Sequence, residues 1–200
     1  MIVGVLLAAG GSSRMGQPKQ LLPFGRGTLV QAALRPFLMA PSVARVIVVV
    51  GHRAEAVVRA VAMDERVTIV ENRRWREGMA SSIRAGVRWV PPRTDAILLG
   101  LGDQPRVPVA VVEQLCARHL AGRPPAQVLI PTFHGRRGHP VLFAGGLRKA
   151  LMTLDGDEGA RGLIRSLAAG VKEVPVQSPG ILLDCDTPEE YSALARTPVT

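Results

Sequence analysis

The stretch IVGVLLAAGGSSRMGQPK fills residues 2–19 and joins an apolar run of strand length to a loop of small residues. The run is continuous rather than alternating, which is typical of a strand that helices cover on both faces. It is too short for a membrane span or a signal peptide, and it has no basic leader. We therefore interpret residues 2–8 as the first strand of an α/β sheet and residues 9–19 as the loop that follows it.

The loop has the composition of a phosphate-binding site. Its glycines let backbone N–H groups approach a ligand, and Arg14 and Lys19 add two cations. Gly11 and Gly16 have the spacing of a Walker A motif, but Gln and Pro stand where that motif requires Lys and Ser or Thr. The sequence also lacks the GxGxxG fingerprint of dinucleotide-binding folds. Because a plain turn would not require the two cations, we predict a phosphate-binding loop of another kind.

The rest of the chain alternates strand and helix patterns. The expected strands are residues 45–50, 67–70, 96–101, 128–130, 171–176 and 181–183. The expected helices are residues 28–39, 54–62, 78–89, 109–120 and 159–169, and a last one that begins at Pro188. This alternation predicts a single-domain, Rossmann-like three-layer sandwich with a mostly parallel sheet. No linker or repeat divides the 200 residues, and we expect residues 197–200 to be frayed.

Composition narrows the classes of partner. The formal net charge of +9 indicates an anionic partner. The basic residues are scattered and aromatic residues make up only 4% of the chain, so neither a nucleic acid nor a membrane is an expected partner. Cys116 and Cys185 do not form a CxxC pair, which argues against a zinc site or a disulfide framework. We expect a cytoplasmic protein that binds a phosphorylated small molecule.

The loop resembles the LxAAGxSxRMGxxK signature of the MobA-like nucleotidyltransferases, and most closely that of their molybdenum cofactor cytidylyltransferase branch. Five further segments resemble motifs of this family: Asn72–Ser82, Gly102–Pro105, Gly135–Phe143, Gly156–Ile164 and Leu183–Tyr191. Ordered motifs along nearly the whole chain are far more specific than one loop. The resemblance implies a nucleotide-diphospho-sugar transferase-like fold, with a nucleotide- and metal-binding part at residues 1–105 and an acceptor-binding part at residues 106–196.

Three aspartates are candidates for holding the Mg²⁺ that the resemblance implies. Asp103 directly follows a buried strand, where it can serve a hard cation or cap the next helix, and the resemblance favours the metal. Near the C-terminus, the resemblance implies that one aspartate faces the cation. We prefer Asp184 over Asp186, because Asp186 precedes Thr187 and Pro188, in the position of a helix cap.

The resemblance also assigns the other site residues. The nucleotide would contact Leu7, Ala8, Ala9, Gly10, Gly11, Ser12, Ser13, Arg14, Lys19, Asn72, Ser81, Ser82 and Asp103. Arg14, Lys19 and Asp103 would be catalytic, because placed charges stabilise the negative charge that builds up in phosphoryl chemistry. The acceptor would border Arg137, Gly138, His139 and Pro140. On the residues alone, either serine could instead cap a helix, and His139 could be structural. We interpret His52, Trp75, Trp89 and His119 as packing or surface residues.

For the cytidylyltransferase branch, the implied reaction is transfer of CMP from CTP to the molybdopterin cofactor, giving molybdopterin cytosine dinucleotide and pyrophosphate. Ala8, Ala9 and Gln104 resemble the cytidylyl form of the motifs. One alternative is a guanylyltransferase, or an enzyme acting on another phosphorylated acceptor. An alternative of a different class is a non-catalytic chaperone that binds a nucleotide or cofactor. We also expect transient contact with a molybdoenzyme.

Overall fold

A central sheet takes up most of the apolar runs within the residues that the computed structural model describes, 1–61 and 64–196. Its strand order is β10-β7-β9-β6-β1-β4-β5, with β8 paired to β7. The strands are β1 Ile2–Ala8, β4 Val43–Val50, β5 Val67–Glu71, β6 Ala96–Leu101, β7 Val128–Phe133, β8 Arg136–Arg137, β9 Val141–Ala144 and β10 Val171–Pro175. Only the pairs that involve β8 or β9 are antiparallel. The prediction of a mostly parallel sheet is confirmed.

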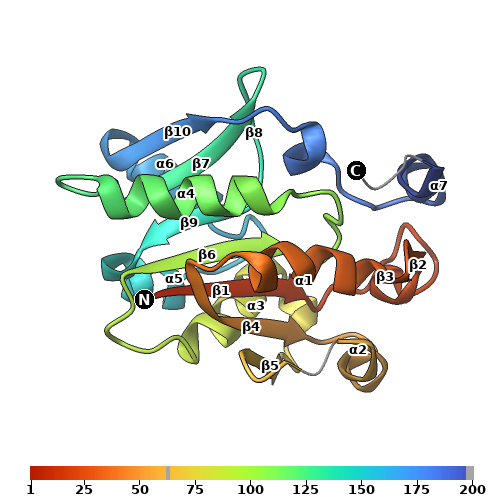
Figure 1. The fold of residues 1–200 in the computed structure, drawn as a ribbon. Helices are drawn as coiled ribbons and strands as arrows, with labels where there is room; N and C mark the ends of the chain where they lie inside the picture. The colour runs from red at the N-terminus through yellow and green to blue at the C-terminus, as the bar shows by residue number, and fades with distance from the viewer. Residues whose placement is uncertain (62–63, 197–200) are drawn as a thin grey trace.

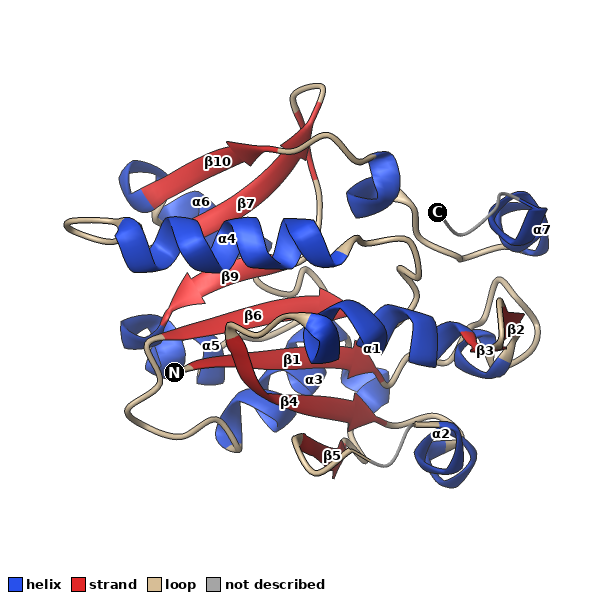
Figure 2. Ribbon diagram, viewed as in Figure 1, coloured by secondary structure: helices blue, strands red, loops and turns tan. Residues whose placement is uncertain are grey.

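Helices cover both faces of the sheet (Figures 1 and 2). They are α1 Leu29–Met39, α2 Ala54–Ala60, α3 Met79–Arg88, α4 Val109–Ala121, α5 Arg148–Met152, α6 Arg161–Ser166 and α7 Pro188–Arg196. One buried cluster joins the sheet to α1, α2 and α4, and a second joins it to α3, α5 and α6. Along β1, Leu6 belongs to the first cluster and Val5 to the second, because successive strand residues point to opposite faces. The three-layer sandwich is therefore confirmed.

A small hairpin and the last helix form a third cluster beside the sheet. The hairpin strands are β2 Pro23–Phe24 and β3 Gly27–Thr28, and they lie next to α7 in Figure 1. The Tyr191 hydroxyl on α7 donates a hydrogen bond of 2.7 Å to the carbonyl of Pro23. Phe24 and Leu194 are both buried in this cluster. The last helix is thereby tied to the segment that follows the phosphate-binding loop.

One predicted element is wrong, and another is confirmed only in part. The strand expected at 181–183 is a 3₁₀ turn, Pro179–Leu182, because Pro179 has no N–H for a ladder and the Ser178 side chain accepts from the backbone N–H of Gly180. The helix expected at 159–169 is the short α6, followed by a 3₁₀ turn at Ala168–Gly170. Residue 62 and residues 197–200, for which we predicted a helix end and fraying, lie outside the described residues.

One strand that the sequence did not reveal shapes the sheet. β9 lies between β6 and β7 and runs antiparallel to both. Val141, its first residue, pairs with Leu99 near the carboxyl end of β6. The segment that enters β9 therefore lies at the same edge as the loops that follow β1, β4 and β6. None of the helices in the described ranges has the length and apolar character needed to span a bilayer.

Candidate active site

The loop after β1 is held in shape by its own polar groups. The carbonyl of Ser12 accepts hydrogen bonds from the N–H groups of Met15 and Gly16, both at 3.1 Å. The Ser12 hydroxyl accepts from the backbone N–H of Lys19 at 3.1 Å, and the Gln20 amide donates to the carbonyl of Gly10 at 3.0 Å. Ser12 has a positive φ of 56°. These bonds form a tight turn, which places Lys19 beside the end of β6.

Four charged side chains form a network at this edge. The Lys19 ammonium donates to the carboxylates of Asp103 and Asp186, each at 2.6 Å, and Arg14 pairs with Asp186 at 2.8 Å. Lys19 is only 8% exposed. Burial by itself lowers the pKa of Lys19, but the two carboxylates outweigh it, so its pKa lies above the ordinary value. Lys19 therefore stays protonated at neutral pH and contacts Asp186, which lies 167 positions later in the chain.

The two carboxylates on Lys19 are arranged to share a cation. Both oxygens lie 2.6 Å from the same nitrogen. The other oxygen of Asp103 is buried and has no hydrogen-bond partner among the described residues. Within the same residues, there is no cluster of three or more His, Cys, Asp or Glu side chains that could hold a metal ion. This donor set fits Mg²⁺, which typically takes one or two carboxylates and completes its shell with phosphates and water.

Our reason for preferring Asp184 as the second ligand is wrong. Thr187, not Asp186, caps α7: its hydroxyl accepts from the N–H of Glu190 at 3.2 Å, and the Glu190 carboxylate accepts from the N–H of Thr187 at 2.9 Å. This reciprocal capping box leaves the Asp186 carboxylate free to reach Lys19. Asp184 is more exposed than Asp186. Partial desolvation of its carboxyl group raises its pKa against an opposing backbone hydrogen bond, and the charges of Asp103 and Asp186 raise it further.

A cavity of about 630 Å³ opens above the network. Its wall contains ten of the predicted nucleotide-binding residues: Leu7, Ala9, Gly10, Gly11, Ser12, Ser13, Arg14, Lys19, Ser82 and Asp103. Asp186 also lines it, whereas Asp184 does not. A larger cavity of about 890 Å³ lies between the β2–β3 hairpin, α1 and the start of α4, and it contains none of the predicted site residues. We take the smaller cavity as the candidate active site because the charged network opens into it.

The other predicted nucleotide residues lie behind the wall. Ala8 is buried in the sheet. Asn72 is buried and donates to the hydroxyls of Ser81 and Ser82 at 2.8 and 3.0 Å. Neither serine caps α3, whose first N–H, that of Met79, is instead bonded to the Asp157 carboxylate at 3.1 Å. Asn72 therefore positions Ser82, the member of the trio that lines the cavity, and the same amide also donates to Ser81.

The predicted acceptor residues stand apart from the described wall of the cavity. Arg137 is exposed and pairs with Glu173 at 2.8 Å. Gly138 packs so tightly that a Cβ atom there would lie 2.4 Å from the carbonyl of Ile181. Burial lowers the pKa of His139 to about 4; Arg161 lowers it too, and Asp103 opposes the shift. Pro140 is buried. His139 is therefore neutral at pH 7.

Of the four residues interpreted as packing or surface, one belongs to the site. Trp75 lines the cavity, and its ring lies 2.8 Å from the position that a Cβ atom on Gly11 would take. His52 packs against that ring, with centroids 5.3 Å apart. Trp89 is 61% exposed and His119 is buried, as interpreted. The only signal for Trp75 was its place between Asn72 and Gly78, within a segment that resembles a family motif.

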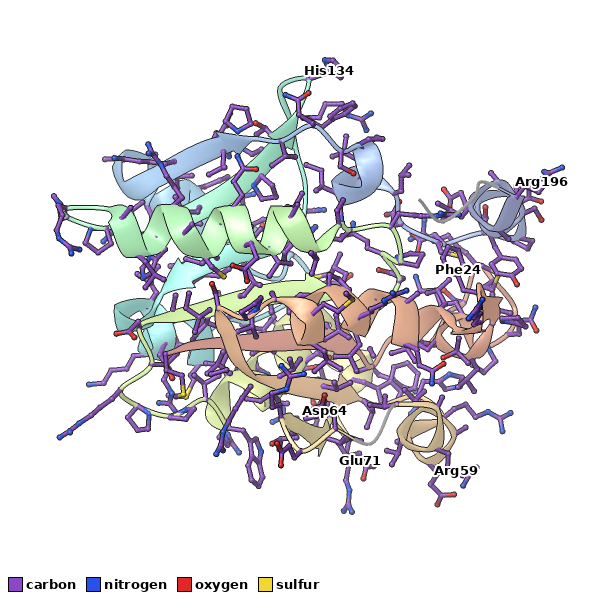
Figure 3. The ribbon with its side chains drawn as sticks, viewed as in Figure 1. Phe24, Arg59, Asp64, Glu71, His134 and Arg196 are labelled. Carbon is purple, nitrogen blue, oxygen red and sulfur yellow. The ribbon has the colours of Figure 1, made fainter. Side chains whose placement is uncertain are left out.

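The cavity wall does not include His134, which lies on the β7–β8 turn. Figure 3 shows the His134 side chain at the outer tip of this turn, pointing away from the rest of the molecule. His134 has a positive φ of 48° and is exposed. His139, by contrast, is only partly exposed, and the charges of Asp103 and Arg161 act on its pKa.

Comparison with known protein sequences identifies relatives over the whole chain. A family model for the MobA-like NTP transferase domain matches residues 4–171. Nicotine blue oxidoreductase of Paenarthrobacter nicotinovorans is 37% identical, with 96% of each chain covered. Molybdenum cofactor cytidylyltransferase of Escherichia coli is 28% identical, with 94% of this chain and 92% of that protein covered. The purine catabolism protein PucB of Bacillus subtilis is 32% identical, with 98% and 96% covered.

Solved structures give the same picture. Rv0371c from Mycobacterium tuberculosis superposes with a TM-score of 0.85 at 34% identity, covering 99% of this chain and all of that one. The same protein in complex with manganese gives a TM-score of 0.80 at 33% identity, with 98% of each chain covered. A nucleotidyl transferase from Methanothermobacter gives a TM-score of 0.81 at 28% identity, covering 98% of this chain and 96% of that one. A relative of this fold thus binds a divalent metal.

Proposed function

Because the chain belongs to the MobA-like NTP transferase family, we propose that this nucleotidyltransferase moves CMP from CTP to the molybdopterin cofactor and releases pyrophosphate. The observation that carries the proposal is the pair of carboxylates, Asp103 and Asp186, that share one cation position beside the phosphate-binding loop. The similarity to a molybdenum cofactor cytidylyltransferase supports CTP and molybdopterin. Residues 1–105 would then bind the nucleotide and metal, and residues 106–196 the acceptor, apart from Asp186.

The proposed reaction is an in-line displacement at the α-phosphorus of CTP. An oxygen of the acceptor phosphate forms the new bond to phosphorus, and the bond to the bridging oxygen of pyrophosphate breaks. The acceptor phosphate is already an anion at neutral pH, so the site requires no strong general base. This fits the low pKa of His139, about 4, which leaves it a neutral hydrogen-bonding group rather than a cation for the acceptor.

The chain's own cations would stabilise the leaving group. Lys19 and Arg14 line the cavity, and we propose that they exchange their carboxylate partners for phosphate oxygens when the triphosphate binds. Asp103 and Asp186 would hold Mg²⁺, with Asp184 as the less favoured ligand. The metal, when bound, would neutralise phosphate charge and act as a Lewis acid. Deleting one such charge typically costs about 2.7 to 4 kcal/mol of transition-state stabilisation.

The identity of the acceptor distinguishes two candidate functions. Two relatives that are more than 30% identical carry names unconnected with molybdopterin, a nicotine blue oxidoreductase and a purine catabolism protein. A second candidate is therefore NTP transfer, by the same residues, to a different phosphorylated acceptor. We also propose transient contact with a molybdoenzyme, and a cytoplasmic location, which the two free and buried cysteines support.

Pyrophosphate release from each of the four ribonucleoside triphosphates, with and without molybdopterin, tests the proposal. We expect release only with CTP, molybdopterin and a divalent metal together, and none after EDTA treatment. Release with GTP would make the protein a guanylyltransferase. Binding of CTP without release in the presence of molybdopterin would indicate another acceptor. Binding without turnover on any phosphorylated acceptor would favour a chaperone.

A further inference from the structure

The cavity wall carries one cation that the proposed chemistry does not use. Arg14, Lys19 and Arg76 line it, together with Asp103, Asp157 and Asp186. Arg14 and Lys19 are both paired with carboxylates of the wall. Arg76, by contrast, makes no ion pair or hydrogen bond within residues 1–61 and 64–196. Its charge is available to an anion in the cavity without any carboxylate having to be displaced.

Arg76 is held in place by an aromatic ring. Its guanidinium lies over the Trp75 indole, 4.4 Å from the ring centroid, which is the geometry of a cation–π contact. The indole in turn packs against the backbone of Gly11 and beside the ring of His52. Trp75 thus connects three segments: the phosphate-binding loop, the end of β4 and the turn before α3. An arginine stacked in this way loses less conformational freedom when it binds a ligand.

We infer that Arg76 is a third phosphate-binding residue, which contacts the triphosphate in the cavity that Arg14 and Lys19 also line, and that Trp75 is the positioning residue that presents it. A guanidinium binds phosphate oxygens with two parallel hydrogen bonds. The indole that carries Arg76 also touches Gly11 of the phosphate-binding loop. Only the Trp75 side chain therefore lies between Arg76 and the loop backbone that would hold the phosphates. The inference rests on the proposed function, because it requires a nucleotide in this cavity.

The first test is the dissociation constant for CTP, measured by calorimetry in the presence of Mg²⁺. We expect Arg76→Gln to weaken binding by about tenfold or more, as for the loss of one charge-assisted contact, and Arg76→Lys to recover part of the loss. Arg73→Gln is the matched control, because Arg73 is an exposed arginine of the same turn, pairs with Glu71 at 3.7 Å and does not line the cavity. Equal affinity of Arg76→Gln and the wild type would overturn the inference.

A double-mutant cycle tests the role of Trp75. We expect Trp75→Leu to weaken CTP binding, Trp75→Phe to retain most of the affinity, and Arg76→Gln to add little in the Trp75→Leu background, because the arginine is no longer held. A full tenfold addition in that background would show that Trp75 does not act through Arg76. Circular dichroism and the melting temperature check that each variant is folded.

Intrinsic fluorescence separates this inference from the proposed function. The chain has two tryptophans, so Trp89→Phe leaves Trp75 as the only tryptophan, and Trp89 is 61% exposed. CTP should change the Trp75 emission in that background, and the titration should give a weaker affinity once Arg76→Gln is added. If CTP binds the wild type and Arg76→Gln equally, only the inference fails. If CTP does not bind the wild type at all, the proposed function fails with it.

Discussion

The two walls of the cavity are built in different ways. The first wall is a single continuous loop, in which Ser12, Lys19 and Gln20 hold the backbone through contacts no more than ten residues apart. The second wall is formed by residues from separate segments of the chain. It includes Asp157 and Asp186, which lie in the last quarter of the chain. These reach the site through long-range bonds, such as that from the Cys185 N–H to the carbonyl of Asp103 at 3.1 Å.

Because of this difference, we expect substitutions in the two walls to affect turnover and stability differently. The first wall supplies cations on a locally determined turn, so we expect changes there to act on turnover with little effect on folding. The second wall supplies carboxylates that depend on tertiary contacts, so changes there affect activity, stability or both, according to the residue. Lys19 joins the walls, because its ammonium contacts Asp103 and Asp186 at the same distance of 2.6 Å.

The largest effect is expected where the walls meet. Lys19→Met and Arg14→Ala should each lower turnover by at least about a hundredfold, because both cations would act on phosphate charge in the transition state. Pyrophosphate release measures this, with Lys172→Ala as a control, since Lys172 is exposed on β10. Near-normal turnover in either variant would show that the first wall is only a structural turn and takes no part in catalysis.

The Lys19→Met substitution should also change the affinity for a divalent metal. Removal of the ammonium leaves two carboxylates facing one position, so Mn²⁺ should bind the variant more tightly than the wild type in the absence of nucleotide. Electron paramagnetic resonance of free Mn²⁺ measures this directly. Unchanged Mn²⁺ binding would show that the ammonium and the metal do not compete for the two carboxylates.

The next effect compares Asp186, which lies on the second wall, with Asp184, which does not line the cavity. Asp186→Asn should cut turnover and raise the Mg²⁺ concentration needed for half activity, because asparagine keeps the size but loses the charge that attracts a hard cation. Asp184→Asn should leave both nearly unchanged. The reverse pattern would restore Asp184 as the ligand, and no change in Mg²⁺ dependence for either variant would remove the two-carboxylate site.

Thr187→Ala is the control for the same comparison. It should lower the free energy of unfolding by about 0.5 to 2 kcal/mol through loss of the α7 cap, and change turnover little. A large loss of turnover at full stability would show that Thr187 belongs to the site.

The smallest effect concerns the pH dependence of stability. The pKa of His139 is about 4 in the folded protein, below its ordinary value of 6.5. As the pH falls below 6.5, the unfolded chain takes up a proton that folded His139 does not, so its contribution to stability is complete above pH 6.5 and is lost toward pH 4. Between pH 7 and pH 5 we expect a loss of about 2 kcal/mol from this group.

Denaturant unfolding at the two pH values measures this difference. His139→Gln should show a smaller loss than the wild type, whereas His134→Gln should match the wild type, because His134 is exposed at the tip of the β7–β8 turn. Equal losses in the wild type and His139→Gln would show that the pKa of His139 in the folded protein does not differ from its ordinary value.

The sequence alone was sufficient to predict the strands of the parallel core and most of the residues of the first wall. β1 and β6 were predicted to the residue, because a strand covered on both faces leaves a continuous apolar run between turn residues. It was insufficient for β9, whose four residues resemble any short apolar segment. It also failed for residues 181–183, where an apolar triplet forms a 3₁₀ turn that the preceding Pro179 and Gly180 allow.

The sequence by itself determined that Gly10, Arg14 and Lys19 form one loop after a buried strand, because local backbone geometry and neighbouring side chains are sufficient to shape that loop. Only the tertiary structure decided that Asp186 rather than Asp184 faces Lys19, and that Trp75 is part of the wall. Two aspartates separated by one residue have the same chemistry in a sequence. The choice between them depends on the capping box of α7 and on bonds across the chain, and these exist only after the two walls have packed together.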